Sequence, residues 1–319
     1  MLDRLPTLCI LAALLAGCSA YAPPLARPVA VAARAGDSGT SWMAPGAKKI
    51  DLLYVSDYAT NDVDAYSYPQ GKLSGVLRGV LRGDPWPAGL CSDNAGNLYI
   101  PDSANDTVLE YAHGGTRLVK TLADESYVPF SCAVDPVSGD LAVMDIVSFA
   151  GQGGVSIYKR ARGLPHFYTA GFVYKYYFGA YDAGGNLYVD ASDDVPSEPF
   201  AFVELRRGGH ALKEIELDQS VAVPGGVGWD GEHVLVADSR ASAVYRFAVA
   251  GTSGKKAGTT RLRGGRFVTQ FVVAGATIAA AQFHGKSFGF WNYPGGGSPV
   301  ERIEGLREPF GIALSAAPK

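Results

Sequence analysis

The chain has 319 residues and a formal net charge of −3, with 47% hydrophobic and 18% charged residues. This balance provides no basic stripe of the kind that nucleic-acid binding requires, so we expect no nucleic acid as a partner. Forty glycines and seventeen tyrosines favour tight turns and half-buried strands, and therefore an all-β protein.

The N-terminal segment has the pattern of an export signal. Arg4 precedes an apolar run, Leu5 to Ala16, that is too short to cross a bilayer as a stable helix. The run leads into Leu15, Ala16, Gly17 and Cys18, which resemble the lipobox of bacterial lipoproteins. The resemblance implies that residues 1–17 are a removable signal peptide and that Cys18 carries the lipid. The alternative is an ordinary secretory signal followed by a chance cysteine.

A tether is expected to follow the signal, over residues 18–49. This stretch is rich in Ala, Pro, Gly and Ser and shows no period. A flexible coil of this length reaches roughly 30 Å. We therefore expect a domain over residues 50–319 that is anchored through lipid to a bacterial membrane and faces the periplasm or the cell exterior.

From residue 50 onward the sequence repeats itself about every 45 residues, which is the period of a four-stranded propeller blade. In each repeat an apolar strand follows a turn rich in Asp, Gly and Asn, and a further strand and a glycine turn come next. The strand-ending positions are Asp57, Asp102, Asp145, Asp190, Asp238 and Gln282. They are separated by 45, 43, 45, 48 and 44 residues, which predicts six blades.

The two ends of the repeat region complement each other. Pro309 to Leu314 has the pattern of an inner strand without partners, whereas the first repeat begins at Leu52 without an inner strand. We expect the C-terminal strand to complete the first blade, because such closure removes exposed sheet edges. The predicted fold is a six-bladed all-β propeller of four-stranded blades, and we expect a monomer.

Over roughly Ile50 to Leu314 the chain resembles the NHL-repeat and gluconolactonase-like six-bladed propellers. The resemblance lies in the strand-end acids, the turns before them and entries such as Pro309-Phe310-Gly311. Gluconolactonase-like enzymes bind a divalent metal in the central channel through Glu, Asn and Asp from different blades. No early glutamate matches that pattern here, so no catalytic residue and no metal ligand is carried over. A metal-dependent lactonase or hydrolase is the alternative function.

The repeated acids also invite comparison with a ring of metal ligands. A residue that recurs in nearly every blade more often caps a loop in every blade by accepting backbone N–H bonds. We therefore predict caps at these positions and no cofactor.

Two cysteines, Cys91 and Cys132, fall in the inner strands of adjacent blades. Counted back from the turn acids Asp93 and Asp135, they stand two and three positions away, so they lie on opposite faces of their own sheets. Opposite faces of neighbouring blades meet. We therefore predict a disulfide between the blades, with two buried thiols as the alternative.

The third and fourth blades carry longer loops than the others. From strand end to the aligned residue of the next strand there are 13 and 15 positions in these blades and 9 in the others, which indicates insertions at 146–154 and 191–199. Such loops share one face with the connections between blades and commonly form binding surfaces. The predicted binding-face residues are Phe130, Tyr174, Tyr176, Tyr177, Phe178, Asp190, Asp193, Asp194 and Phe310.

Each part of this surface has an alternative explanation. The aromatic residues would also suit packing between outer strands. The acidic stretch would suit Ca²⁺ or a basic partner, and a plain solvated loop is the other possibility. We predict a non-enzymatic binding or scaffold module for a protein, glycan or small-molecule ligand that the sequence does not name.

Overall fold

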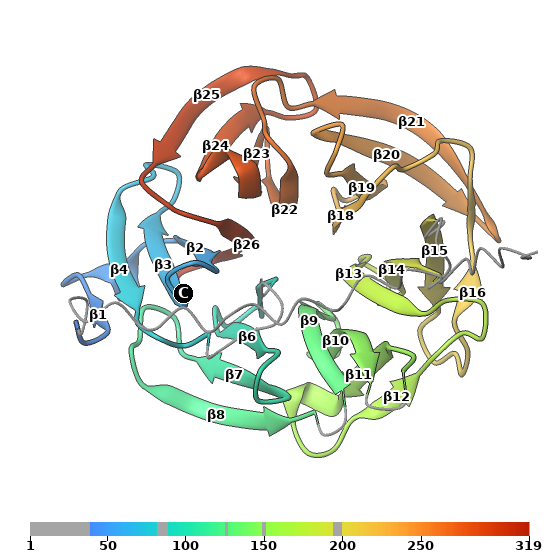
Figure 1. Cartoon of the computed structure of the whole chain (residues 1–319), viewed down its shortest axis with the longest axis horizontal. Coiled ribbons are helices and arrows are strands. Elements are labelled where there is room, and N and C mark those ends of the chain that lie inside the picture. Colours follow the sequence, from blue (N-terminus) through green and yellow to red (C-terminus); the bar gives the residue numbers. More distant parts are fainter. Residues whose placement is uncertain (1–38, 82–88, 125–126, 149–150, 194–199, 319) are drawn as a thin grey trace, which may run out of the picture.

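The computed structural model describes residues 39–81, 89–124, 127–148, 151–193 and 200–318. Six β-sheets stand around a central axis as the blades of a propeller (Figure 1). The architecture is the one expected from the repeat. The expected signal peptide, Cys18 and residues up to 38 lie outside the described residues.

The first three blades are built from consecutive strands, except that blade 1 takes its inner strand from the C-terminus. Blade 1 contains β26 (Pro309–Ser315), β2 (Leu52–Asp57), β3 (Asp62–Ser67), β4 (Leu73–Leu77) and, outermost, β1 (Trp42–Met43). Blade 2 contains β5 (Cys91–Ser92), β6 (Leu98–Asp102), β7 (Thr107–Tyr111) and β8 (Leu118–Ala123). Blade 3 contains β9 (Tyr127–Val134), β10 (Leu141–Ser148), β11 (Gly154–Tyr158) and β12 (His166–Tyr168).

The other three blades follow in chain order. Blade 4 contains β13 (Lys175–Tyr181), β14 (Leu187–Ser192), β15 (Phe200–Leu205) and β16 (Lys213–Glu214). Blade 5 contains β18 (Pro224–Trp229), β19 (Val234–Asp238), β20 (Ala243–Ala250), β21 (Ser253–Arg261) and β17 (Glu216–Leu217), which pairs with β21 in parallel. Blade 6 contains β22 (Val268–Ala274), β23 (Thr277–Gln282), β24 (Ser287–Asn292) and β25 (Gly296–Glu304). Short 3-10 turns form at η1 (Ala47–Lys49), η2 (Lys159–Ala161) and η3 (Phe283–Gly285).

The ring closes where β26 pairs with β2, which confirms the expected closure. Ser315 stands opposite Leu52, and Ile312 stands opposite Val55. All six residues of β2 are buried, because neighbouring blades cover both faces of the sheet. The hydrophobic core accordingly lies between the blades as a series of clusters around the ring.

The folded part begins before Ile50, where the sequence placed its start. Trp42 pairs with Val76 and Met43 pairs with Gly75, so β1 covers the outer edge of β4. Ala47 is also buried. Part of the segment that the sequence assigns to the tether therefore belongs to the folded domain. The two residues of β1 cover the outer edge of β4, which would otherwise be open. Among the described residues, no helix is long and apolar enough to span a membrane.

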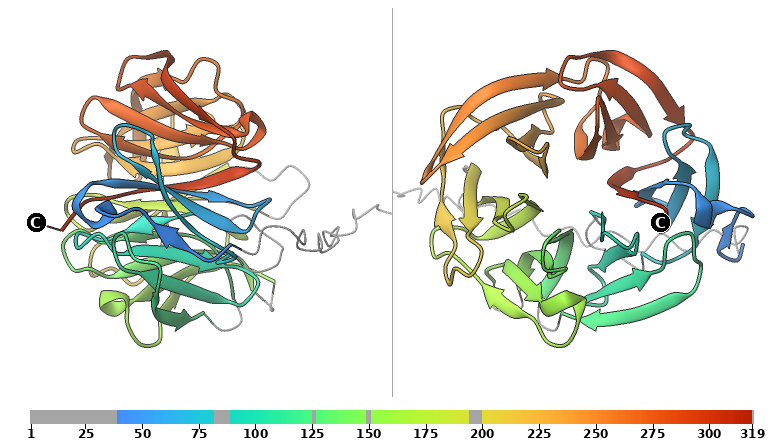
Figure 2. Two further views of the ribbon diagram at one scale, coloured as in Figure 1. Left: turned by 90° about the vertical axis from the view of Figure 1, so that its left-hand side faces the viewer. Right: turned by 180° about the vertical axis from the view of Figure 1, so that it is seen from behind.

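The two faces of the disc differ in what they carry. We call the mouth face the one on which the second strand of each blade ends and the inner strand begins. Residue 39 lies on this face, because β1 runs antiparallel to β4 and Ser41 Oγ accepts a hydrogen bond from Arg78 N–H just beyond β4. The C-terminus leaves from the opposite face, as the side view in Figure 2 shows.

Candidate binding face at the channel mouth

The strand-end acids hold the chain where it enters the inner strands. Asp57 accepts hydrogen bonds from the N–H groups of Arg307 and Glu308, at 2.7 and 2.9 Å, just before β26. Asp238 accepts one from Ala222 N–H, at 2.9 Å, just before β18. These contacts agree with the predicted capping role. The carboxylates of Asp57 and Asp238 are thus engaged with the backbone.

Gln282, which replaces the acid in blade 6, serves the same purpose. Its Oε1 accepts a hydrogen bond from Arg266 N–H, at 3.2 Å, and its Nε2 donates to Ser287 Oγ. Only an acceptor oxygen is required at this position, so an amide can take the place of the carboxylate.

Asp190 was expected on the binding face, and this expectation is wrong. Its side chain is fully buried and its Oδ1 accepts a hydrogen bond from Phe178 N–H, at 2.7 Å. The pKa of Asp190 is raised well above its ordinary value, because burial disfavours the charged form. The physical reason is that β14 continues through Ser192 and pairs with β15, so Asp190 lies inside a strand rather than in a loop.

Asp145 differs from the other strand-end acids because it meets a second carboxyl. Asp145 and Asp124 are fully buried, and their side chains lie within hydrogen-bonding reach of each other across the seam between blades 2 and 3. Ser156 Oγ donates to Asp145 Oδ2 at 2.8 Å, and Tyr158 OH donates to Asp124 Oδ1 at 2.7 Å. No donor contacts the other oxygen of either carboxyl within the described part of the chain.

The pKa of Asp145 is raised well above its ordinary value, first by burial and then by the charge of Asp124. Across residues 39–318, apart from the undescribed gaps, no group of three or more His, Cys, Asp or Glu side chains converges to hold a metal ion. The pair is therefore best described as two carboxyls that meet within the protein interior.

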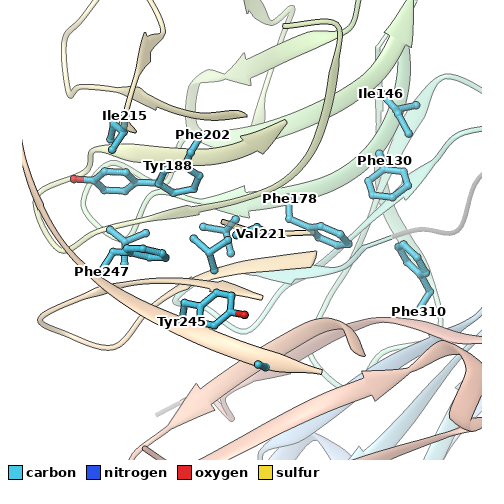
Figure 3. Close-up of a cluster of buried hydrophobic side chains, with 14 residues drawn as sticks. Phe130, Ile146, Phe178, Tyr188, Phe202, Ile215, Val221, Tyr245, Phe247 and Phe310 are labelled. Carbon is cyan, nitrogen blue, oxygen red and sulfur yellow. The ribbon is translucent and has the colours of Figure 1, made fainter. Parts of the chain in front are cut away.

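Three of the predicted aromatic residues come together at the mouth of the channel. Phe130 from β9, Phe178 from β13 and Phe310 from β26 have ring centroids 5.3, 5.4 and 5.8 Å apart (Figure 3). Each contributes from a different blade, and each is 8% exposed or less. Tyr177 and Phe283 extend the cluster, at 5.6 Å from Phe130 and 6.1 Å from Phe310. We call these five residues the aromatic mouth.

The remaining predicted residues divide between packing and surface. Tyr176 is fully buried between blades 3 and 4, and its hydroxyl accepts a hydrogen bond from Ala170 N–H at 2.8 Å. Tyr176 therefore belongs to the core, in agreement with the alternative that the predicted aromatic residues serve in packing. Tyr174 is half-buried, and its carbonyl accepts a hydrogen bond from Gly153 N–H. Asp193 is also half-buried, and Asp194 lies outside the described residues.

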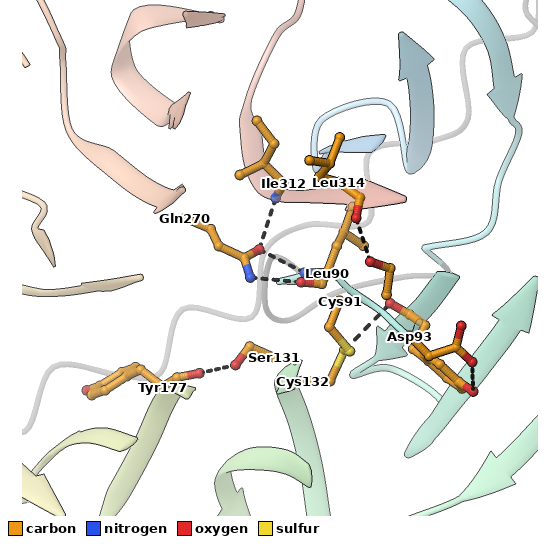
Figure 4. The surroundings of a disulfide bond; sticks show 11 residues. Leu90, Cys91, Asp93, Ser131, Cys132, Tyr177, Gln270, Ile312 and Leu314 are labelled. Atoms are coloured by element: carbon orange, nitrogen blue, oxygen red, sulfur yellow. Dashed lines mark hydrogen bonds between the residues drawn. A yellow bond between two sulfur atoms is a disulfide. The ribbon is translucent and has the colours of Figure 1, made fainter. Parts of the chain in front are cut away.

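The side chain of Gln270 reaches from blade 6 to blades 1 and 2. Its Oε1 accepts hydrogen bonds from Leu90 N–H and Ile312 N–H, both at 2.9 Å, and its Nε2 donates to the Leu90 carbonyl at 2.8 Å (Figure 4). Blades 6, 1 and 2 are thereby joined through one side chain. Sequence reasoning missed Gln270, because a single amide in an inner strand belongs to no motif.

Cys91 and Cys132 form a disulfide between blades 2 and 3, with Cα atoms 5.5 Å apart (Figure 4). Both half-cystines are buried in the cluster between these blades. The bond fixes β5 to β9 two residues beyond Phe130.

A groove of about 320 Å³ lies at the outer side of blade 4. It opens where the chain leaves β16 after Glu214 and crosses to β21 as β17, so the Phe200 end of β15 is not covered. Phe200, Ile215, Leu217 and Val221 supply apolar lining, and Glu214 and Glu216 supply carboxylates.

The comparisons with known proteins identify the architecture. A chain of a nidogen–laminin complex matches with a TM-score of 0.69 and 12% identity, over 84% of this chain and 100% of that one. A Bacteroides caccae protein of unknown function matches with a TM-score of 0.62 and 13% identity, over 83% and 99%. Streptogramin B lyase matches with a TM-score of 0.52 and 11% identity, over 79% and 73%.

The fold is that of an NHL-like six-bladed β-propeller. At these identities the likeness extends to the fold alone. No protein-family model matches the chain, and no curated protein matches it in sequence.

Proposed function

We propose that the protein is a non-enzymatic binding or scaffold propeller that uses its mouth face. The observation that carries the proposal is the meeting of Phe130, Phe178 and Phe310 over the channel. These rings are 8% exposed or less, so they would support a binding surface formed by the more exposed residues around them, and they offer no oxygen for a cation. The nearby carboxylates of Asp57 and Asp238 support the same conclusion, because backbone N–H groups already occupy them.

We propose further that Cys18 carries a lipid and anchors the propeller to a bacterial membrane, facing the periplasm or the cell exterior. The support is the apolar run that leads into Cys18 and the position of residue 39 on the mouth face. The anchor and the binding surface would then lie on the same side of the molecule. Mass spectrometry of the mature N-terminus tests this, with a triacylated Cys18 as the expected result and an unmodified cysteine as the contrary one.

Two exposed apolar residues on opposite faces provide a matched test of the binding proposal. Phe172 is 46% exposed in the connection between blades 3 and 4, on the mouth face, and Leu164 is 85% exposed before β12, at the other end of blade 3. We expect Phe172→Ser to weaken binding of ligands from a glycan and peptide panel by about tenfold or less, as a rim contact. Leu164→Ser should leave binding unchanged.

The purified original protein tests the alternative of a metal-dependent lactonase or hydrolase. Bound metal is measured by elemental analysis, and the melting temperature is compared with chelator and with added Ca²⁺, since a ligand of the folded state raises apparent stability. A stoichiometric metal together with lactone hydrolysis would overturn the binding proposal. Equal binding by the Phe172→Ser and Leu164→Ser variants would remove the mouth face from it.

A further inference from the structure

We propose that the ligand of the mouth face is an acidic polysaccharide, and that it lies along the half of this face formed by blades 5, 6 and 1. The inference rests on the proposed binding function and names the class of ligand. We call this half the basic half. Its cations are Arg240, Arg263, Arg266, Lys286 and Arg307.

The loops that carry these cations form one continuous surface. Leu262 N–H donates to the Ser242 carbonyl at 3.0 Å, which joins the connection between blades 5 and 6 to the loop of Arg240. Phe283 N–H donates to the Phe267 carbonyl at 3.1 Å, which joins that connection to the loop of Lys286. In blade 1, Tyr58 N–H donates to the Glu308 carbonyl at 3.0 Å, beside Arg307.

The exposed cations of the mouth face gather on one half of it. All five cations of the basic half are exposed, and Glu308 is the only acid in the loops at 58–61, 239–242, 262–267, 283–286 and 305–308. The opposite loops, at 103–106, 151–153, 169–174, 193 and 219–223, contain two partly buried aspartates, Asp106 and Asp193, and neither Lys nor Arg, although Lys175 follows at the start of β13. Because the whole chain carries a net charge of −3, the basic half does not follow from composition.

These cations are available to a ligand. Within the described part of the chain, none of the five forms an ion pair with an acid. Arg266 and Arg307 bond to the protein through their backbone N–H groups, to Gln282 and Asp57, and their side chains are exposed. Guanidinium groups pair with carboxylates in a bidentate manner, so the surface suits an anion that bears carboxylates.

Aromatic rings between the cations favour a sugar chain over other polyanions. His284 lies 4.8 Å from Phe267 and 5.2 Å from Phe283, centroid to centroid, and Phe283 leads on to Phe310 of the aromatic mouth. Phe267 and Phe283 are only partly buried, so their rings can pack against the apolar face of a sugar. A flat anionic membrane would also meet the opposite loops with Asp106 and Asp193, whereas a chain can follow the basic half alone.

The test uses the purified full-length protein with polygalacturonate and alginate as acidic probes. Neutral dextran, polyglutamate and phosphatidylglycerol vesicles are the comparison probes. We expect binding to the acidic polysaccharides that weakens as salt rises. The test variant combines Arg266→Gln, Arg307→Gln and Lys286→Asn, and we expect it to bind at least tenfold more weakly. These substitutions keep the backbone bonds, and Asn tolerates the positive φ of residue 286.

The matched control combines Lys48→Gln, Lys49→Gln and Lys72→Gln, which removes three exposed cations near the opposite face. It should bind within twofold of the original protein. Equal loss in both triple variants, or no binding to either acidic polysaccharide, would overturn the proposal. Stronger binding to polyglutamate or to vesicles would overturn it as well. If a neutral glycan or a protein bound in a manner that depends on Phe172, the proposed function would stand and this inference alone would fail.

Discussion

At the scale of single residues, the contact between Asp124 and Asp145 makes the stability of the protein depend on pH. Two carboxylates in contact within the core cannot both stay charged, so the pair retains a proton. The groups that face it are Tyr158 and Ser156 from β11, Tyr127 from β9 and Asp106 before β7. Among the described groups that shift the pKa of Asp145, none is a cation, and only the hydrogen bond from Ser156 favours the charged form.

The folded-state pKa of Asp145 is raised, so the folded protein binds a proton that the unfolded chain releases. Its contribution to stability is therefore present at pH values below the unfolded pKa and is lost as pH rises through the folded pKa. We predict that Asp145→Asn flattens this dependence, because an amide can donate to Asp124 at every pH. At pH 8 the variant should be more stable by about 1–3 kcal/mol, the cost of an unsatisfied buried group. Urea unfolding at pH 5 and pH 8 measures both effects.

Asp57→Asn provides the control for that substitution. Both oxygens of Asp57 already accept backbone N–H bonds, so an amide would place a donor against a donor. This variant should lose about 1–3 kcal/mol at either pH. An Asp145→Asn protein with the original pH profile would show that the pair holds no shared proton.

At the scale of elements, the inner strand of blade 2 is held chiefly by its neighbours. β5 has two residues, whereas the other inner strands have six or more. The disulfide ties it to β9, Gln270 ties Leu90 to β22, and Ser92 Oγ donates to the Leu314 carbonyl of β26 at 2.6 Å. Contacts from three other blades thus take the place of the backbone hydrogen bonds that a longer inner strand would form.

We predict that Gln270→Ala destabilises the protein by about 2–4 kcal/mol, because it leaves the buried N–H groups of Leu90 and Ile312 without an acceptor. Hydrogen exchange should accelerate at these two amides. Gln219→Ala is the control, since the Gln219 side chain bonds near the surface to Ser220 and Lys256, and should cost less than about 0.5 kcal/mol. Unchanged exchange at Leu90 in the Gln270 variant would contradict the role assigned to this side chain.

The elements also explain which parts of the fold could be predicted from sequence. The strand-end acids and the turns before them recur in each blade, so period and closure followed from spacing. β1 has only two residues and no counterpart in the other blades, so no repeat pattern marks it. The start of the fold was therefore placed too late. The insertion at 191–199 was placed wrongly in part, because β14 and β15 lengthen together and pair Ser192 with Phe200.

The candidate site was predictable only where it depends on the repeat. Phe130, Phe178 and Phe310 occupy related positions near the starts of inner strands, so their meeting followed from symmetry. The Asp124 and Asp145 pair and the bridge by Gln270 join unrelated positions of different blades. Such contacts depend on side-chain directions that the spacing of a single sequence does not specify.

At the scale of the whole molecule, stability depends on closure of the ring by the last strand. β26 completes blade 1 and also bears Phe310 of the aromatic mouth and Ile312, which is fully buried. Its backbone receives further contacts from neighbouring blades, as Thr269 Oγ1 donates to the Phe310 carbonyl at 2.6 Å. Removal of β26 would therefore open the channel, the seam between blades 1 and 6 and the inner edge of β2 together.

We predict that a chain ending at Glu308 loses its cooperative thermal transition and self-associates through the open edge of β2, because an unpaired inner strand is a template for pairing. A chain ending at Ala316 is the control. It loses the bond from Ala317 N–H to Asp51 and keeps all of β26, so it should melt within a few degrees of the intact protein. Circular dichroism and light scattering measure both properties, and we expect the intact protein to be a monomer.

A synthetic peptide of residues 305–319, added in excess, should restore the transition of the shorter chain by supplying β26 in trans. A cooperative, monomeric melt of the chain ending at Glu308 without the peptide would show that the other five blades hold the ring by themselves.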